Sequence, residues 1–502
     1  MTKLLNKKYL FWGGIFLVIA LFVLICCLAN RGVRKEKACL TSYSLDLSYD
    51  DSSHELFGNE RVVYFNNSDN MFSVLYFHLY PNAFREDAAN KVVSANHVGE
   101  AYPNGYSYGS IEISGVTGEN GKLMNYEICG EDKNILAVEL PTGLYPEESV
   151  FLNINFKTSL ANINHRLGYG ENTINFGNFY PIACVYESGI GFSQNLYHSN
   201  GDPFYSDCAN YQVSITYKSN FEIASTGEKI AEKKENGFVT SSYKAAKVRD
   251  FCFVLSCQFQ KVCKLYNDIE INYYGYNGDK NLEESLTACI DAVQTFEEMF
   301  GDYPYPQLSI VKSNFVYGGM EYPNIVLISD SITAQNDINY VIVHEIAHQW
   351  WYGMVGNDEY NHAWLDEGLA EYSTLLFYRK NPQYGEDFDA LINGAVENYK
   401  LFERVYIKVN GSVDGRMERP LCDFQTEPEY VQCVYTKGVI MFNSLRELVG
   451  DKKFMATLKD YFEKFQFQNA APENIIARFV SGCGRMAEEF FDSWLNGEVV
   501  IK

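Results

Sequence analysis

The sequence predicts an α+β protein of several domains, with an N-terminal transmembrane helix, an all-β domain and a mostly helical domain. Three observations predict this class. An uncharged apolar run near the N-terminus is long enough to span a bilayer. Alternating apolar and polar residues separated by turn residues fill the next stretch, and apolar residues at helical spacing dominate after it. At 502 residues the chain is too long for one ordinary core, and its length suggests about three domains.

The composition is that of a globular protein and argues against nucleic-acid binding. Hydrophobic residues make up 47% of the chain and charged residues 21%. Beyond position 37 the chain holds 34 Lys and Arg against 63 Asp and Glu. Nucleic-acid binding needs basic surface that displaces counterions from phosphates, so we expect no nucleic-acid partner. The acidic balance instead favours cationic or amine-bearing ligands.

The apolar run covers residues 9–29 and follows a short N-terminal segment, residues 1–8. Twenty-one helical residues span about 31 Å, which matches a hydrocarbon core of about 30 Å. We therefore expect a retained single-pass anchor that contacts the lipid bilayer. The alternatives are a cleaved signal peptide, which normally has a shorter apolar region and a small-residue cleavage site, and lipidation at Cys26 or Cys27.

The orientation of this anchor is not decided by charge. Three Lys precede the run and four basic residues follow it, so the positive-inside rule does not choose a side. We expect the large acidic part to be extracellular, because a single N-terminal anchor is a common way to tether an exported protein. Residues 30–38 would form a juxtamembrane linker.

Residues 39–264 are predicted to form a β-rich domain, a sandwich or a large saddle-like sheet. Segments such as ERVVYFNN and YQVSITY alternate apolar and polar residues, with Asn, Gly and Asp between them. Near residue 265 the pattern changes, and a helix is expected over Asn281–Phe300. Residues 265–502 are therefore assigned to a second, mostly helical domain.

The segment VIVHEIAHQWW contains the motif H-E-x-x-H. His344 and His348 are spaced i, i+4, so a helix places both imidazoles on one face, where they can bind one metal ion. Glu345 lies about 100° further round the helix, beside the metal rather than on it. The pattern favours zinc over a helix with two structural histidines.

A third ligand is expected at Glu367, inside WLDEG and separated from the second histidine by 18 intervening residues. A metzincin would need a His at position 354, which is Met354, and His362 has no ligand motif around it. Two His and one Glu form a catalytic zinc set with one open position, so we expect one Zn²⁺ per chain. Zinc lowers the pKa of a bound water, and Glu345 would accept its proton as general base.

These residues resemble the aminopeptidase N family of gluzincin metallopeptidases. H-E-x-x-H, the 18-residue spacing and W-L-x-E-G match the family pattern. GGMEY at 318–322 is similar to its G-x-M-E-N motif, and YVQCVYTKG resembles the segment that carries its catalytic tyrosine. The resemblance implies a thermolysin-like catalytic domain and removal of the N-terminal residue from peptides with a free N-terminus.

The resemblance also implies roles for further residues. Gly318, Gly319, Met320 and Glu321 would bind substrate, with Glu321 holding the α-amino group, and Tyr435 would stabilise the oxyanion.

Three points of the family pattern stay open in this chain. The motif has Tyr322 where the family has Asn. Glu371 is either a hydrogen-bond acceptor for a ligand histidine or a solvated charge. A second amine-binding residue would be Glu171, Asn172 or Asn175.

Two other functions compete with an aminopeptidase. One is a different zinc hydrolase such as an endopeptidase, against which Glu321 argues. The other is a tethered binding protein with a relict site, against which the intact site residues argue: His344, Glu345, His348, Glu367 and Tyr435. The sequence does not indicate the oligomeric state.

Overall fold

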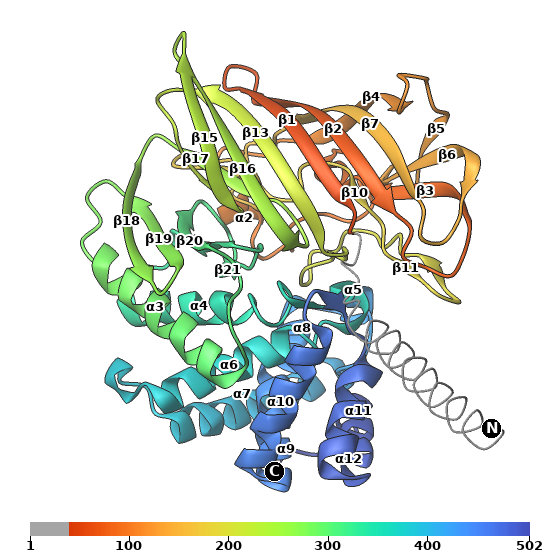
Figure 1. Ribbon diagram of the computed structural model, residues 1–502. Coiled ribbons are helices and arrows are strands. Elements are labelled where there is room, and N and C mark those ends of the chain that lie inside the picture. The colour runs from red at the N-terminus through yellow and green to blue at the C-terminus, as the bar shows by residue number, and fades with distance from the viewer. Residues whose placement is uncertain (1–39, 502) are drawn as a thin grey trace, which may run out of the picture. The chain divides into compact units, whose positions relative to one another are not determined.

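The computed structural model describes residues 40–501, which belong to one compact unit. The predicted N-terminal segment (1–8), anchor (9–29) and linker (30–38) lie outside these residues. Within residues 40–501 no helix is both long and apolar enough to cross a bilayer. Strands gather in one part of this unit and most helices in the other, in that order along the chain (Figure 1). The predicted order of a sheet-rich part followed by a helical part is confirmed.

The sheet-rich part is built around a seven-stranded sheet. Its strands, in spatial order, are β15 (Glu228–Glu235), β16 (Phe238–Val248), β13 (Ala209–Lys218), β1 (Ser42–Asp50), β2 (Glu55–Phe65), β7 (Ser149–Ser159) and β4 (Ser110–Gly118). Every second residue of β13 is buried, beginning with Ala209, Tyr211 and Val213. This is the burial that apolar–polar alternation predicts, because successive side chains point to opposite faces of a strand.

Smaller sheets complete this part. One four-stranded sheet has the order β10 (Ile182–Ala183), β3 (Phe72–His78), β6 (Ile135–Leu144) and β5 (Tyr126–Cys129). A second has the order β14 (Glu222–Ser225), β17 (Phe253–Ser256), β9 (Ile174–Phe176) and β8 (Leu167–Tyr169). A two-stranded sheet pairs β11 (Tyr186–Glu187) with β12 (Gly191–Phe192). A 3₁₀ helix (Tyr80–Phe84) and the short helix α2 (Val98–Ala101) interrupt the strands.

A five-stranded sheet leads into the helical part. Its order is β18 (Phe259–Tyr266), β19 (Ile269–Tyr276), β20 (Gln307–Ser313), β22 (Ile325–Ser329) and β21 (Gly319–Met320). β21 runs antiparallel to β22 and lies at the edge of this sheet. The predicted domain limit at residue 264 falls inside β18; the limits themselves stay a prediction.

The helices follow the sheet. They are α3 (Leu282–Met299), α4 (Gln335–Ala347), α5 (Glu359–His362), α6 (Glu367–Lys380), α7 (Phe388–Asn410), α8 (Glu427–Val431), α9 (Lys437–Val449), α10 (Asp451–Phe465), α11 (Pro472–Cys483) and α12 (Met486–Leu495). This part also contains 3₁₀ helices at Pro382–Tyr384 and Leu421–Asp423. A short strand pair, β23 (Val355–Gly356) and β24 (Gln468–Asn469), lies among the helices. α3 forms where Asn281–Phe300 was predicted, and buried apolar residues line one of its faces.

The two parts share one hydrophobic core that runs from the first strand to the last helix. Arg249 lies between β16 and β17, is 1% exposed, and connects the sheet-rich part to the helical part. Its guanidinium donates to the carbonyl oxygens of Tyr352 (2.6 Å), Gln468 (2.6 Å) and Met354 (3.3 Å) in the helical part, and to that of Ser206 (2.8 Å) in the sheet-rich part. Gly356 is required beside it, because a Cβ there would lie 2.1 Å from Arg249 Cζ.

We expect Arg249→Met to lower the free energy of unfolding by about 3 kcal/mol or more, because it leaves several buried carbonyl groups without a donor. Urea unfolding followed by tryptophan fluorescence measures this change. Arg61→Met is the matched control: Arg61 pairs with Asp46 on the surface, with 47% of its side chain exposed, and an exposed pair contributes about 1 kcal/mol at most. Equal effects of the two substitutions would contradict the role of Arg249.

Candidate active site

α4 positions the two histidines of the H-E-x-x-H motif. His344 lies in its last turn and His348 caps its C-terminus. Their Nε2 atoms are 3.2 Å apart, and both residues are buried, at 9% and 1% exposed. The i, i+4 spacing therefore produces the convergence that the sequence predicts.

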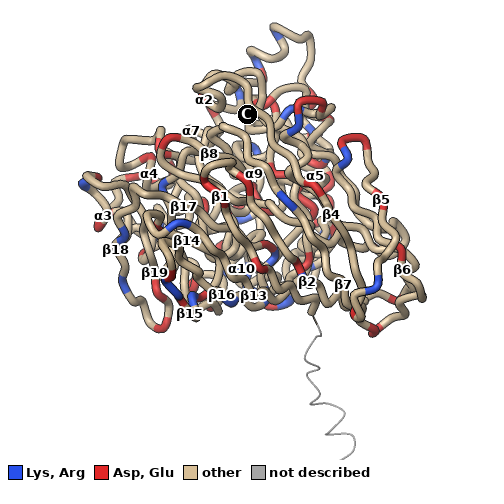
Figure 2. The backbone as a smooth tube through the Cα atoms, turned by 90° about the horizontal axis from the view of Figure 1, so that it is seen from above, with Lys and Arg blue, Asp and Glu red and all other residues tan. Residues whose placement is uncertain are grey.

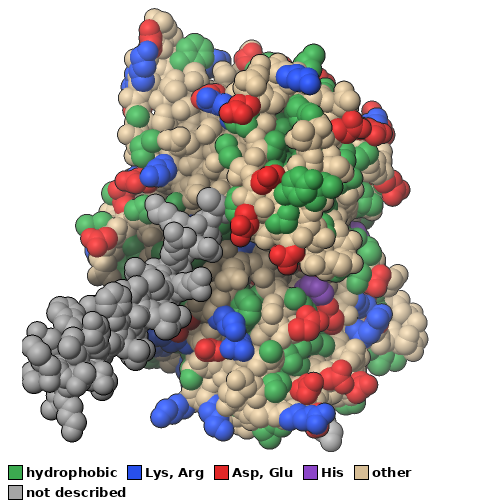
Figure 3. Space-filling view, turned by 45° about the vertical axis from the view of Figure 1, so that its right-hand side comes forward, with side chains coloured by type: hydrophobic (Ala, Val, Ile, Leu, Met, Phe, Trp, Pro, Cys, Tyr) green, Lys and Arg blue, Asp and Glu red, His purple; other side chains and the backbone are tan. Residues whose placement is uncertain are grey.

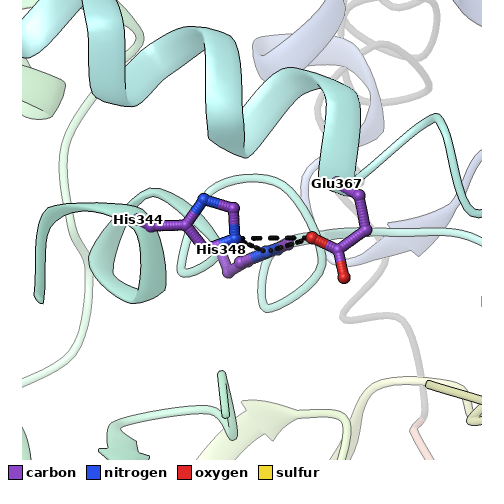
Figure 4. A group of neighbouring side chains, drawn as sticks. All are labelled: His344, His348 and Glu367. Atoms are coloured by element: carbon purple, nitrogen blue, oxygen red, sulfur yellow. Dashed lines mark hydrogen bonds and ion pairs between the residues drawn. The ribbon is translucent and has the colours of Figure 1, made fainter. Parts of the chain in front are cut away.

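Glu367 is the first residue of α6 and completes the cluster (Figure 4). Its Oε2 lies 3.1 Å from His348 Nε2 and 3.4 Å from His344 Nε2. Burial opposes the charged form of all three groups. The mutual attraction nevertheless outweighs it, so the pKa of each imidazole is raised and that of Glu367 is lowered.

The geometry of this set fits a zinc ion. A tetrahedral ion with ligand bonds of about 2.0–2.2 Å has neighbouring ligand atoms about 3.3 Å apart, and the three separations here are 3.1, 3.2 and 3.4 Å. Two imidazole nitrogens that face each other at this distance need a shared proton or a cation between them. Two nitrogens and one carboxylate oxygen are ligands that zinc prefers.

The other ring nitrogen of each histidine is held as well. His348 Nδ1 donates to the carbonyl oxygen of Trp351 (2.9 Å), and His344 Nδ1 lies 2.8 Å from Glu371 Oε2. The Tyr340 hydroxyl donates to the other oxygen of Glu371 (2.6 Å). These contacts orient both rings with Nε2 toward the cluster, as partners of metal ligands commonly do. Two roles were open for Glu371, a hydrogen-bond acceptor for a ligand histidine and a solvated charge. The structure therefore favours the acceptor.

Glu345 lies beside the cluster and outside the ligand set. It is 5% exposed, and one of its oxygens has no hydrogen-bond partner within residues 40–501. Gly319 makes room for it, because a Cβ there would lie 2.3 Å from Glu345 Oε1. Burial raises the pKa of Glu345 to about 7, against the opposing effect of the two histidines. A carboxyl group of this kind exchanges protons near neutral pH.

Glu321 follows β21 and is 3% exposed, and its Oε1 is without a hydrogen-bond partner among the described residues. Burial and then the charge of Asp202 raise its pKa. Gly318 and Gly319 line the same cavity as Glu321. The Met320 side chain is fully buried in the core and does not line it, because neighbouring side chains of a strand point to opposite faces.

Tyr435 lies on a π-helical turn, Gln432–Thr436, directly before α9. Its hydroxyl donates to Glu367 Oε1, and its ring stacks on that of His344 with centroids 5.9 Å apart. Burial raises the pKa of Tyr435, so the phenol keeps its proton. π-helical turns inside α-helices are frequent at functional sites.

A contact between two glycines sets the spacing of Glu367 and Tyr435. Gly368 follows Glu367 in α6, and Gly438 follows Tyr435 by three residues in α9. A Cβ on Gly438 would lie 2.8 Å from Gly368 Cα. Only glycine at position 438 lets the two helices approach this closely.

A cavity of about 410 Å³ collects these groups, and Met320 is the one residue of the predicted metal, catalytic and substrate-binding set that does not line it. Sequence reasoning missed several other lining residues: His97, Arg166 and Asp202 from the sheet-rich part, and Glu427 and Tyr430 from α8. None of them stands in a local motif that signals its role. His362, predicted as structural, contacts Glu418 (2.5 Å) and is not part of the ligand cluster.

The three candidates for a second amine-binding residue do not line the cavity. Glu171 is exposed and Asn172 is half-buried. The Asn172 side chain donates to Asp330, and that of Asn175 donates to the carbonyl oxygens of His165 and Asn314. Asp202, which pairs with the buried Arg166, occupies the cavity instead.

Comparison with known proteins relates part of this chain to a family of peptidases. Residues 284–494 match the family model described as Peptidase family M1 domain. Human endoplasmic reticulum aminopeptidase 2 is 22% identical over 400 residues, which is 74% of this chain and 40% of that protein. Mouse aminopeptidase B is 28% identical over 239 residues, 43% of this chain and 34% of that protein. The chain thus spans about two fifths or less of the length of these curated relatives.

Solved structures agree on the fold. An M1 zinc metallopeptidase from Deinococcus radiodurans superposes with a TM-score of 0.65 over 92% of this chain and 94% of that chain, at 17% identity. The matched segment 284–494 contains every site residue that the motifs predicted. Residues 284–494 of this chain, which hold the His-His-Glu cluster, therefore match a Peptidase family M1 domain.

Proposed function

We propose that this protein is a zinc aminopeptidase that removes the N-terminal residue from peptides. One observation carries the proposal: the buried carboxyl group of Glu321 lies in the same cavity as the His344, His348 and Glu367 cluster. A buried carboxylate at this place stabilises the ammonium group of a free N-terminus, whereas an internal peptide bond offers it no cation.

The substrate's amino group would be held by two carboxylates. Glu321 supplies one, and Asp202 acts electrostatically on Glu321 more strongly than any other charged neighbour. Asp202 comes from the sheet-rich part, so both parts of the molecule would contribute to amine binding. It would replace the predicted candidates Glu171, Asn172 and Asn175.

His344, His348 and Glu367 would hold one Zn²⁺ per chain. When bound there, zinc supplies Lewis-acid chemistry, polarising the scissile carbonyl and acidifying a water molecule. Glu345 would take the proton of the attacking water and pass it to the leaving amine nitrogen. Tyr435 would donate its hydrogen bond to the carbonyl oxygen as negative charge develops there.

A panel of fluorogenic aminoacyl amides tests the proposal. Zinc-loaded protein should cleave the free amides and leave the N-acetylated amides intact, and a chelator should abolish cleavage. Equal cleavage of acetylated and free substrates would support the alternative of a zinc endopeptidase. Absence of cleavage by protein with a full complement of zinc would support a relict binding protein.

The close contact between Gly368 in α6 and Gly438 in α9 leads to a separate prediction. We expect Gly438→Ala to lower kcat by about 10²-fold, because displacing a reacting group by about 1 Å has an effect of that size, while zinc content and KM stay close to those of the wild type. Gly394→Ala in α7 is the matched control, since a Cβ there meets nothing within 4 Å. An unchanged kcat in Gly438→Ala would show that the two helices can separate without moving Tyr435.

We also propose that residues 9–29 tether the enzyme to a membrane, with the catalytic part outside the cell. The uncharged apolar run supports this proposal. Carbonate extraction of membranes from cells that express the full chain tests the anchor, and protease treatment of intact cells tests its side. Recovery of the protein in the carbonate-soluble fraction would contradict the anchor.

A further inference from the structure

No donor fixes the buried Oε1 atom of Glu321. Glu321 follows β21 at the edge of its sheet, and this oxygen has no hydrogen-bond partner within residues 40–501. A carboxylate that binds an ammonium group must nevertheless be held in place, because the contact is short and directional. The backbone of segment 321–324, and the groups that hold this backbone, therefore decide where Glu321 points.

Gln349 holds this segment from the helical part. It directly follows the cluster residue His348 and is 1% exposed. Its side-chain amide donates to the carbonyl oxygens of Tyr322 (3.2 Å) and Glu321 (3.4 Å), and its oxygen accepts from the Asn324 N–H group (2.9 Å). These contacts join the backbone of the segment to the end of α4.

The Tyr322 side chain makes a second attachment, to the sheet-rich part. The side chain is fully buried, and its hydroxyl donates to Asn178 Oδ1 (2.5 Å). Gly177, which follows β9, leaves room for the phenol, because a Cβ there would lie 2.0 Å from Tyr322 Oη. Any other residue at position 177 would displace the ring.

Asn178 is itself held firmly. Its backbone has the left-handed conformation, with φ of 52°, and its side-chain amide donates to Asp250 Oδ2 (2.6 Å). The other oxygen of Asp250 accepts from the Tyr180 hydroxyl (2.8 Å) and from the Phe251 N–H group (2.6 Å). Asn178, Asp250 and Tyr180 are all 3% exposed or less. A buried network whose members all have partners is rigid, so it offers Tyr322 a fixed acceptor.

Of the three residues 320–322, Glu321 alone lines the catalytic cavity. Met320 and Tyr322 are fully buried and lie outside the lining. Because adjacent side chains of an extended chain point to opposite faces, fixing the Tyr322 ring turns its neighbour Glu321 toward the cavity. Asn178 does not line the cavity either, so we expect both residues to act on a substrate only through Glu321.

We propose that Tyr322 is a positioning residue for Glu321, and that it acts through the hydrogen bond of its hydroxyl to Asn178. Recognition of a free N-terminus then depends on the sheet-rich part as well as on the helical part. This inference rests on the proposed aminopeptidase function, in which Glu321 binds the ammonium group of the substrate.

The charge of the protein as a whole also favours an ammonium group. Acidic residues are spread along the backbone among fewer basic ones (Figure 2) and over both parts of the face that Figure 3 shows. This field attracts a cation wherever Glu321 points. A test of positioning must therefore leave every charge in place, which Tyr322→Phe and Asn178→Gly both do.

Leucinethiol and its analogue without the amino group isolate recognition of the amine, because the thiolate of each binds zinc and the two differ only in that group. Titration calorimetry with zinc-loaded protein gives both Kd values. We expect wild-type protein to bind leucinethiol about 100-fold more tightly, the effect of a full charge-assisted contact. In Tyr322→Phe this ratio should fall to about 10-fold or less, while the Kd of the analogue and the zinc content remain unchanged.

Asn178→Gly tests the same hydrogen bond from the sheet-rich part. It removes the acceptor of the Tyr322 hydroxyl, and glycine adopts the left-handed conformation of position 178 readily. We expect the same fall in the ratio. Tyr217→Phe is the matched control: Tyr217 is 2% exposed, its hydroxyl lies 2.9 Å from Ser241 Oγ, and it does not line the cavity. Its ratio should equal that of the wild type.

The outcomes separate this proposal from the proposed function. A wild-type ratio that persists in folded Tyr322→Phe and Asn178→Gly would overturn the positioning role and leave amine recognition intact. An equal loss of affinity for both thiols would also overturn it, because general damage to the site does not distinguish the amine. A ratio close to one in the wild type would instead contradict amine binding at Glu321, and with it the proposed aminopeptidase.

Discussion

Replacing Glu345 by Gln should lower kcat by about 10³-fold and leave zinc binding intact. The amide has the shape of the carboxyl group but cannot take a proton, and general acid–base catalysis contributes about 10²–10⁴-fold. Because Glu345 lies outside the cluster of His344, His348 and Glu367, the metal should stay. Hydrolysis of an aminoacyl amide gives kcat, and elemental analysis of the same sample gives the zinc content.

Glu60→Gln is a suitable control for this experiment. Glu60 is also fully buried, without a partner among the described residues, and burial raises its pKa. It lies on β2 and does not line the cavity, so its replacement should leave kcat unchanged. If Glu345→Gln retained more than about a tenth of wild-type kcat, another group would have to move the proton.

Replacing Glu367 by Gln should weaken zinc binding by more than about 100-fold, which is the upper range for loss of an outer partner of a metal ligand. The substitution removes the negative charge that the two imidazoles share and turns an amide toward them. It also removes the carboxylate that accepts the Tyr435 hydrogen bond. Titration with a competing chelator measures the affinity, and activity in excess zinc shows how much of the loss is due to the metal alone.

Glu371→Gln provides the comparison for that titration. Glu371 contacts His344 Nδ1 but lies outside the ligand cluster, so its loss should weaken zinc binding by about 10–100-fold and less than the loss of Glu367. Wild-type zinc affinity in Glu367→Gln would mean that Glu367 is not a ligand. It would also remove the basis for the proposed hydrolase.

Local patterns predicted the parts of this protein whose geometry is local. Alternation in β13 and the helical spacing of α3 correspond to observed elements, because burial on one face of a strand or helix imposes its period directly on the sequence. The i, i+4 pair of His344 and His348 needs only one helix turn to converge. Glu367 and Tyr435 were found through longer motifs, although helix packing is what brings them together.

Sequence motifs did not predict correctly which side chains line the cavity at Met320 and at the amine-binding candidates. Met320 stands between cavity residues in the sequence, yet its side chain points into the core. No local sequence motif indicates that Asp202, Arg166 and Glu427 line the cavity. Their positions depend on how loops of the sheet-rich part meet a helix of the other part. Contacts such as Ser94 to Glu427 join residues 333 positions apart.

The amino-acid sequence by itself determined the order of a sheet-rich and a helical part and the metal-binding motif, because these follow from side-chain period and spacing along one element. Only the tertiary structure decided which carboxylates share the cavity and which of them lack a cation. Those properties depend on burial and on pairs of residues that the folded chain brings together, and neither is encoded at a fixed spacing.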